Sequence, residues 1–282
     1  MNFSSSAADI FVPDGRPVRE ALARTTHLCI AAHQDDIEIM AYPGIAACLE
    51  SKEHWFTGVV VTDGSGSPRA GRFTHFSDEQ MKAVRAEEQR SAARIGKFSC
   101  VVQLAHPSAA VKSAESVAVQ SDLSALLTAM PATTVYLHNP ADKHDTHVAV
   151  FLRCLEALRS LPATQRPNRV YGCEVWRDLD WLLDTDKQVL DASALPALAA
   201  ELVAVFQSQI AGGKRYDLAA AGRRLANATF HNSHATDQAT ALTWAMDLTP
   251  LVQDEKLSVE AFTLGYIDRL REDVAARIRK FT

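Results

Sequence analysis

The sequence predicts an α/β protein with a mostly parallel central sheet between two layers of helices, a three-layer, Rossmann-like arrangement. Short apolar segments rich in β-branched and aromatic residues alternate with longer segments of helical spacing, and the apolar segments are almost continuous, as strands buried on both faces are. The strands are expected at 27–32, 55–62, 100–105, 134–139 and 169–176. The helices are expected at about 42–52, 78–96, 115–130 and 145–160.

The pattern loosens after residue 176. Segments 194–210 and 257–278 have helical spacing, and the second is amphipathic with a mixed-charge face. The stretch "DLDWLLDTDKQVLDAS" is expected to form a short hairpin or an irregular segment, and the glycines of "AGGKRYDLAAAG" predict a loop. We therefore expect one domain over residues 1–282, with a core at about 25–176 and 177–282 as an elaboration that packs on it.

Composition excludes several classes of protein. A chain of 282 residues that is 47% hydrophobic can bury a large core, and its net charge of -5 argues against a nucleic-acid or anionic-membrane partner. No run of 18 apolar residues predicts a membrane span, and the N-terminus lacks the features of a signal peptide. The five cysteines are odd in number and widely spaced, which predicts buried thiols in a reducing cytoplasm. We expect a cytoplasmic protein that acts on a small molecule, either alone or as a homo-oligomer.

The first polar cluster follows the first expected strand, in "CIAAHQDDIEIMAYPGI" (29–45). A turn at the strand end can bring His33 and Asp36 to one point, and an imidazole with a carboxylate suits a borderline metal such as zinc. Asp35 would then be free to take a proton from a metal-bound water. Glu38 is expected to orient a ligand through a hydrogen bond.

The second cluster, "HNPADKHDTH", follows the fourth expected strand and leads into a helix. His144 and His147 lie one helical turn apart, so one imidazole can complete a His-Asp-His set while the other stands beside the open coordination position. Asp142 and Asp145 can hydrogen-bond a ring nitrogen and favour its protonated form. Two clusters at two strand ends are expected to meet, because such sheets collect ligands at the carboxyl ends of their strands.

These residues carry a family resemblance. "AHQDDIE" followed by "HDTH" resembles the signature of the zinc-dependent de-N-acetylases of the PIG-L (LmbE-like) family, Ala-His-Pro-Asp-Asp-x-Glu with a later His-x-x-His. "VVVTDGSGS" and "RAEEQRSAARIG" are similar to a Thr-Asp-Gly loop and an Arg-x-x-Glu helix of that family, and "SALPALAAELVAVFQSQ" is similar to its later helix ending in Ser-Gln. The resemblance extends over roughly residues 27–210.

The resemblance implies a hydrolase that acts on a linear amide C–N bond and removes acetyl from N-acetylglucosamine or another amino sugar conjugate. It implies one zinc ion per chain, with Fe²⁺ or another divalent metal as the alternative. The implied zinc ligands are His33, Asp36 and His147. Asp35 would be the general base, and His144 would stabilise the oxyanion or protonate the leaving amine. Arg85 would contact the substrate. From its own sequence, the glycine-rich loop that begins at Asp63 is also expected to be a substrate loop.

The chain departs from the family pattern at three places. Gln34 replaces the usual proline, which changes the rigidity of the turn and not the ligand set. Thr146 stands where many members have an aspartate, so the charge that tunes His144 would have to come from Asp145 or Asp142. "VFQSQ" lacks the histidine often found before Ser-Gln, which predicts different substrate contacts there.

Other interpretations compete with a zinc amidohydrolase. Two histidines and one carboxylate also form the facial triad of non-haem Fe(II) oxygenases, although an adjacent aspartate has no evident use there. The third hypothesis is a catalytically inactive sugar-binding relative. The argument against it is that the chain keeps all five residues of the implied site, namely His33, Asp35, Asp36, His144 and His147. Two further features have alternatives: His231 and His234 could form a second metal site or be loop residues, and Trp176 and Trp181 could stack on a sugar or pack in the core.

Overall fold

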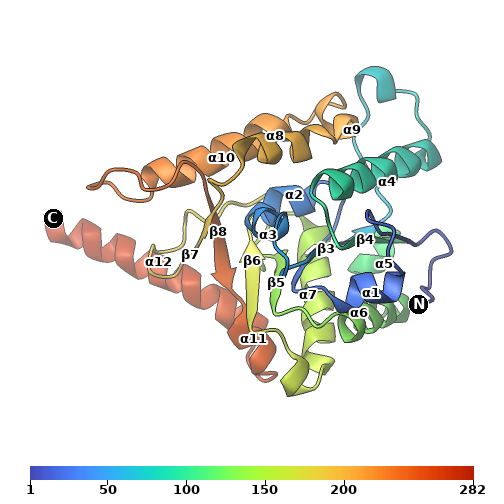
Figure 1. Cartoon of the computed structure of the whole chain (residues 1–282). Helices are drawn as coiled ribbons and strands as arrows, with labels where there is room; N and C mark the ends of the chain where they lie inside the picture. The colour runs from blue at the N-terminus through green and yellow to red at the C-terminus, as the bar shows by residue number, and fades with distance from the viewer.

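A computed structural model describes all 282 residues and contains an eight-stranded sheet in the order β1-β4-β3-β2-β5-β6-β8-β7 (Figure 1). Its five central strands run parallel, as predicted. They are β4 (Cys100–His106), β3 (Phe56–Thr62), β2 (His27–Ala31), β5 (Thr134–His138) and β6 (Arg169–Cys173). Three antiparallel strands extend the edges: β1 (Asp9–Phe11) on β4, β8 (Leu242–Asp247) on β6, and β7 (Gln188–Asp191) on β8.

Helices cover both faces of this sheet, and two buried apolar clusters fill the spaces between the layers. One layer contains α1 (Val18–Ala23), α5 (Ser108–Lys112), α6 (Val117–Ala129), α7 (Asp145–Ser160), α11 (Thr249–Gln253) and the start of α12 (Val259–Phe281). The other contains α2 (Asp36–Met40), α3 (Tyr42–Cys48), α4 (Asp78–Ile95), α8 (Pro196–Ala204) and α9 (Gln207–Ile210), and α10 (Tyr216–Phe230) packs on α8 and β8. Two short 3₁₀ helices lie at Gly71–Phe73 and Ala163–Gln165.

Close packing of α2 against β3 depends on a glycine. A Cβ atom at Gly58 of β3 would lie 2.8 Å from Cδ1 of Ile37, closer than side chains approach. The missing side chain therefore lets α2 lie directly on the sheet, with Ile37 and Met40 fully buried. Because α2 begins at Asp36, this contact also sets the position of that carboxylate.

The C-terminal part differs most from the prediction. The segment expected as a loop, "AGGKRYDLAAAG", turns at Gly213 (φ +106°) and becomes helix α10 from Tyr216, because the alanine-rich run after the glycines favours a helix. The helix expected at 194–210 is two helices, α8 and α9, separated at Phe206. Of the two alternatives for 178–193, the short hairpin is wrong and the irregular segment describes residues 178–187. Residues 188–191 form β7, which pairs with β8 some fifty residues later, and β8 itself was not predicted.

Two simpler expectations agree with the structure. All five cysteines are buried and free, as predicted from their spacing. None of the helices combines the length and the apolar character needed to span a bilayer.

Candidate metal centre

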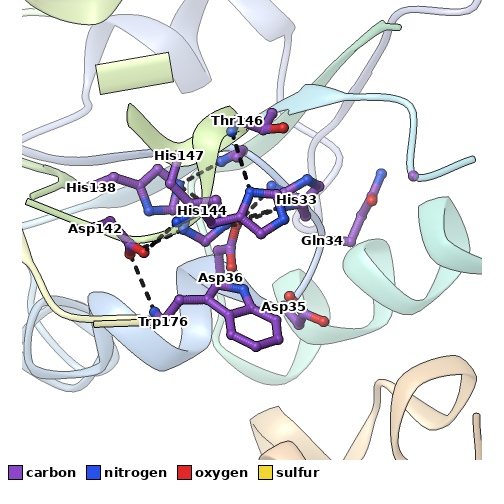
Figure 2. A network of polar contacts seen from close by, with 12 residues as sticks. His33, Gln34, Asp35, Asp36, His138, Asp142, His144, Thr146, His147 and Trp176 are labelled. Carbon is purple, nitrogen blue, oxygen red and sulfur yellow. Dashed lines mark hydrogen bonds and ion pairs between the residues drawn. The ribbon is translucent and has the colours of Figure 1, made fainter. Parts of the chain in front are cut away.

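The site lies at the carboxyl ends of two adjacent parallel strands, β2 and β5 (Figure 2). The chain leaves β2 at Ala31 and reaches α2 within five residues, which places His33 and Asp35 in the turn and Asp36 at the first position of α2. It leaves β5 at His138 and begins α7 at Asp145, with His144 as the residue that caps this helix. Parallel pairing of β2 with β5 therefore brings together the two polar clusters that the sequence separates by about a hundred residues.

Three side-chain atoms of this site form a nearly equilateral triangle. Nδ1 of His33 lies 3.2 Å from Nε2 of His147 and 3.3 Å from Oδ2 of Asp36, and Nε2 of His147 lies 3.3 Å from the same carboxylate oxygen. Ligand atoms of a tetrahedral zinc ion, bound at about 2.0–2.1 Å, are separated by about 3.3 Å. The backbone N–H of His33 also donates to Oδ2 of Asp36 (2.8 Å), which fixes the carboxylate. The residues present therefore fit a divalent cation.

Asp142 supports this triangle from behind. Its Oδ2 lies 3.3 Å from Nδ1 of His147 and accepts the backbone N–H of Trp176 at 3.2 Å. A carboxylate on the outer nitrogen of a metal-binding imidazole directs the inner nitrogen toward the metal. Burial lowers the pKa of His147, but Asp36 and Asp142 reverse this and raise it to about 9. Burial likewise raises the pKa of Asp36, yet His147 and the neighbouring hydrogen bonds hold it well below its usual range.

Asp35 is buried beside the triangle with a strained backbone. Its φ of 90° is one that residues with a side chain rarely adopt, and such strain is typical of functional sites. Gln89 accepts its backbone N–H (3.3 Å), and the guanidinium of Arg85 lies 3.3 Å from its Oδ2. Burial raises the pKa of Asp35 to about 7, although Arg85 opposes this rise. The carboxyl group is therefore able to exchange a proton near neutral pH.

Glu38 does not orient a ligand as the sequence predicted. Its Oε1 accepts from Nε2 of Gln89 (2.8 Å), and Gln89 in turn accepts from the backbone of Asp35. Burial raises the pKa of Glu38 well above its ordinary value. Because α2 turns Glu38 away from the imidazoles and toward α4, this residue supports the backbone of Asp35 through Gln89.

His144 lies beside the triangle, but neither Asp142 nor Asp145 hydrogen-bonds its ring. The ring is stacked on His147, with centroids 4.5 Å apart, and its Nδ1 accepts the backbone N–H of Thr146 at 3.3 Å. Asp142 bonds the ring of His147 instead, and Asp145 is exposed. Burial and the neighbouring histidines His147 and His33 lower the pKa of His144, so the environment favours the neutral ring and not the protonated one.

The two residues expected to contact the substrate are held by protein groups. Arg85 is 2% exposed and donates to Gln34 as well as to Asp35, so it positions the turn between β2 and α2. Asp63 accepts from the backbone and hydroxyl of Ser65 and pairs with Lys82 at 3.2 Å. The side chain of Asp63 therefore organises its own glycine-rich loop and has no contact with the histidine cluster.

Sequence reasoning missed His138. This residue ends β5, is fully buried, and stacks on His147 with centroids 3.9 Å apart. It lies 3.6 Å from Asp36, but its Nε2 already accepts the backbone N–H of Ala32 (2.8 Å), so that nitrogen is not free to bind a metal. The signal was its place as the last residue of an apolar strand, directly before "NPADKHDTH".

A scan against protein-family models matches residues 28–158 to the PIG-L family, described as GlcNAc-PI de-N-acetylase. The chain carries a PIG-L family domain. This domain contains the whole candidate metal centre, from His33 to His147. No match is found among the curated proteins.

Solved structures share the fold of this chain at low identity. The 4-carboxy-2-hydroxymuconate hydratase of Pseudomonas putida KT2440 aligns with a TM-score of 0.59 and 16% identity over 79% of this chain and 96% of its own. The N,N′-diacetylchitobiose deacetylase of Pyrococcus horikoshii aligns with a TM-score of 0.60 and 16% identity over 78% and 83%. A teicoplanin deacetylase in a zinc-inhibited form aligns with a TM-score of 0.55 and 13% identity over 79% of this chain and 97% of its own. These likenesses establish an LmbE-like α/β fold.

Proposed function

We propose that this protein is a zinc-dependent amidohydrolase that removes the N-acetyl group from an amino sugar or a glucosaminyl conjugate. The observation that carries the proposal is the triangle of His33, Asp36 and His147 with the buried carboxyl of Asp35 beside it. The description of the matched family supports amide hydrolysis, and two of the fold neighbours are described as deacetylases.

The ion would be held by Nδ1 of His33, Oδ2 of Asp36 and Nε2 of His147, and Asp142 would keep the ring of His147 in place. When bound, zinc polarises an amide carbonyl and brings the pKa of a water ligand toward about 7. His33 and His144 are half-buried, so the substrate can approach from their side.

Asp35 and His144 would move and hold protons during hydrolysis. With a pKa raised to about 7 by burial, Asp35 can accept the proton of the attacking water and return it to the leaving amine. Because Thr146 donates its N–H to Nδ1 of His144, the neutral ring carries its proton on Nε2. That N–H can donate to the oxyanion that forms on the carbonyl oxygen.

A panel of N-acetylated sugars tests the proposal with purified protein and a defined metal content. We expect about one zinc ion per chain, release of free amine and acetate, and loss of activity after chelation that zinc restores. Co²⁺ and Fe²⁺ belong in the same experiment, since one fold neighbour is described in a zinc-inhibited form.

Three results would contradict the proposal. Full activity of metal-free protein would exclude a metal-dependent mechanism. Oxygen consumption with Fe²⁺ would assign an oxygenase. Addition of water to an unsaturated acid, without amide hydrolysis, would assign chemistry like that of the Pseudomonas putida hydratase.

A further inference from the structure

A cavity of ≈ 200 Å³ lies directly beside the metal centre and shares Asp36 as part of its wall. The end of α2, the segment after β6, helix α10 and strand β8 enclose it. Its apolar walls are formed by Ile39, Val175, Trp176, Tyr216, Ala219 and Ala220. The mechanism proposed above makes no use of this space, and an acetyl group would leave most of it empty.

The charged groups in the cavity lining already have partners in the protein. Arg224 donates to the carbonyl oxygens of Glu38 (2.8 Å) and Ile39 (3.0 Å), and Arg223 donates to the carbonyl oxygen of Val175. Glu174 accepts from Nδ2 of Asn227 (2.6 Å) and from the backbone N–H groups of Leu179 and Trp244. Each of these three side chains therefore has hydrogen-bond partners within the protein and does not need a ligand to supply them.

One buried polar atom of the lining has no partner. The hydroxyl oxygen of Thr243 in β8 is buried without a hydrogen bond, in a residue that is 2% exposed. A sugar ring carries hydroxyl groups around its edge, and most of them would lose water here without gaining a partner. An apolar chain has no hydrogen bonds to water to lose, and burial of each of its methylene groups is favourable by about 0.8 kcal/mol. The six apolar residues of the cavity wall therefore suit the apolar part of a substrate.

The volume sets the size of that part. An apolar cavity of about 150 Å³ is sufficient to bind benzene. A space of ≈ 200 Å³ therefore accommodates a group larger than a benzene ring, and much larger than the methyl of acetyl.

Trp176 separates this cavity from a second, more open groove. Its indole lies below His144 in Figure 2, and the two rings have centroids 5.9 Å apart. On the other side of Trp176, the groove of ≈ 660 Å³ includes the polar residues Lys143, Arg177 and Asp178. The polar half of a substrate can lie there while its apolar half enters the cavity.

We propose that the cavity receives the acyl chain of the substrate, and that the enzyme prefers N-acyl groups of about four to eight carbons or an aromatic acyl group over acetyl. This inference rests on the proposed amide hydrolysis and replaces acetyl with a longer or aromatic acyl group as the preferred substituent on nitrogen. The reaction balances as for acetyl: water adds its oxygen to the carbonyl carbon, the C–N bond breaks, and the products are a longer carboxylic acid and the free amine.

A matched series of N-acetyl-, N-butanoyl-, N-hexanoyl- and N-octanoylglucosamine tests this preference through release of glucosamine. We expect kcat/KM to rise by up to about fourfold for each added methylene until the cavity is full. Binding of hexanoate and acetate to the Asp35→Asn protein, measured by calorimetry, gives a readout that does not depend on turnover.

Two substitutions should fill the cavity. Ala219→Leu projects from α10 into this space, and Ala220→Leu serves as a second variant in case the first leucine turns toward solvent. We expect at least one of them to lower kcat/KM for the hexanoyl substrate about tenfold and to weaken hexanoate binding, with little change for acetyl. Ala221→Leu is the matched control, because Ala221 lies on the same helix but lines the groove toward α8 instead.

The outcomes separate this inference from the proposed function. Faster hydrolysis of the acetyl than of the butanoyl and hexanoyl substrates would overturn the acyl cavity and leave the amidohydrolase intact. If no glucosamine derivative is hydrolysed, hexanoate binding decides: binding lost in a leucine variant supports the cavity, and absence of binding overturns it. An unchanged chain-length profile in both leucine variants would also overturn it.

Discussion

The metal centre and the adjoining cavity come from different parts of the chain. Every residue of the triangle and its support, from His33 to His147, lies within the segment that matches the PIG-L family model. Nine of the eleven residues that line the cavity lie beyond residue 158, where that match ends. If the proposed function is right, the matched segment would supply the chemistry and the C-terminal elements would select the substrate.

The two parts are also held differently. The metal centre is held by short connections at the ends of adjacent parallel strands, so each ligand lies within a few residues of the sheet. The cavity depends on contacts between distant segments, such as the bond from Arg224 to the carbonyl oxygen of Glu38, which are 186 residues apart. Changes in the first part should therefore affect every substrate alike, whereas changes in the second should alter which substrate is accepted.

The largest effect is expected from His147→Ala. Removal of this imidazole leaves two of the three ligand atoms, so zinc should be lost and turnover of every substrate should fall by more than about 10³-fold, because a metal ion contributes several kcal/mol to catalysis. Metal analysis and amine release measure both effects. His234→Ala, a change at an exposed histidine, is the control, and loss of zinc there would point to a second metal site.

Asp35→Asn should separate catalysis from metal binding. The amide keeps the shape of the carboxyl group but cannot accept the proton of water, so kcat should fall by about 10²–10⁴-fold while zinc content stays near one per chain. Asp237→Asn in an exposed loop controls for the loss of one negative charge. Equal loss of zinc and of activity in Asp35→Asn would make Asp35 a ligand instead of a base.

A smaller effect is expected from Asp142→Asn. The ring of His147 would keep a hydrogen-bond acceptor but lose the charge behind it, so zinc affinity should fall by about 10–100-fold. Competition with a chelator measures this change. The same substitution at the exposed Asp145 should leave zinc affinity as it is, and a comparable loss there would restore the role that the sequence predicted for it.

The smallest effect is expected in the C-terminal part. Thr243→Val replaces a buried hydroxyl that has no partner with a methyl group of similar shape, so the free energy of unfolding should rise by about 1 kcal/mol. Urea unfolding measures it. The metal centre should be unaffected, and kcat/KM for long acyl chains should not fall. A drop in stability would mean that the hydroxyl has a partner.

Prediction from the sequence succeeded where the signal is local. Five parallel strands were recognisable because buried strands are short and apolar. The polar residues at two of their ends were recognisable as a candidate metal site, and the structure brings them together. His138 escaped notice because, as the last residue of a strand, it has no partner histidine at a spacing that the sequence displays.

Elsewhere the sequence was insufficient. The hydrogen bonds of Glu38 and Asp142 depend on which face of a turn each side chain occupies. Glu38 was expected to bond a metal ligand, but it bonds Gln89. Asp142 was expected to bond the ring of His144, but it bonds the ring of His147. Helix α10 and strand β8 were missed for another reason. The glycines before Tyr216 indicated a loop where α10 begins. Strand β8 pairs with the edge strand β7, which is far from it in the sequence, so no local pattern identifies the pair.

By itself, the sequence determined the parallel core and the residues available to bind a metal, because both follow from patterns within a few residues of each other. Only the tertiary structure decided that three of those atoms form a triangle with edges of 3.2–3.3 Å, and that a cavity adjoins it. The physical reason is that these distances result from packing between segments far apart in the chain, and no local propensity specifies them.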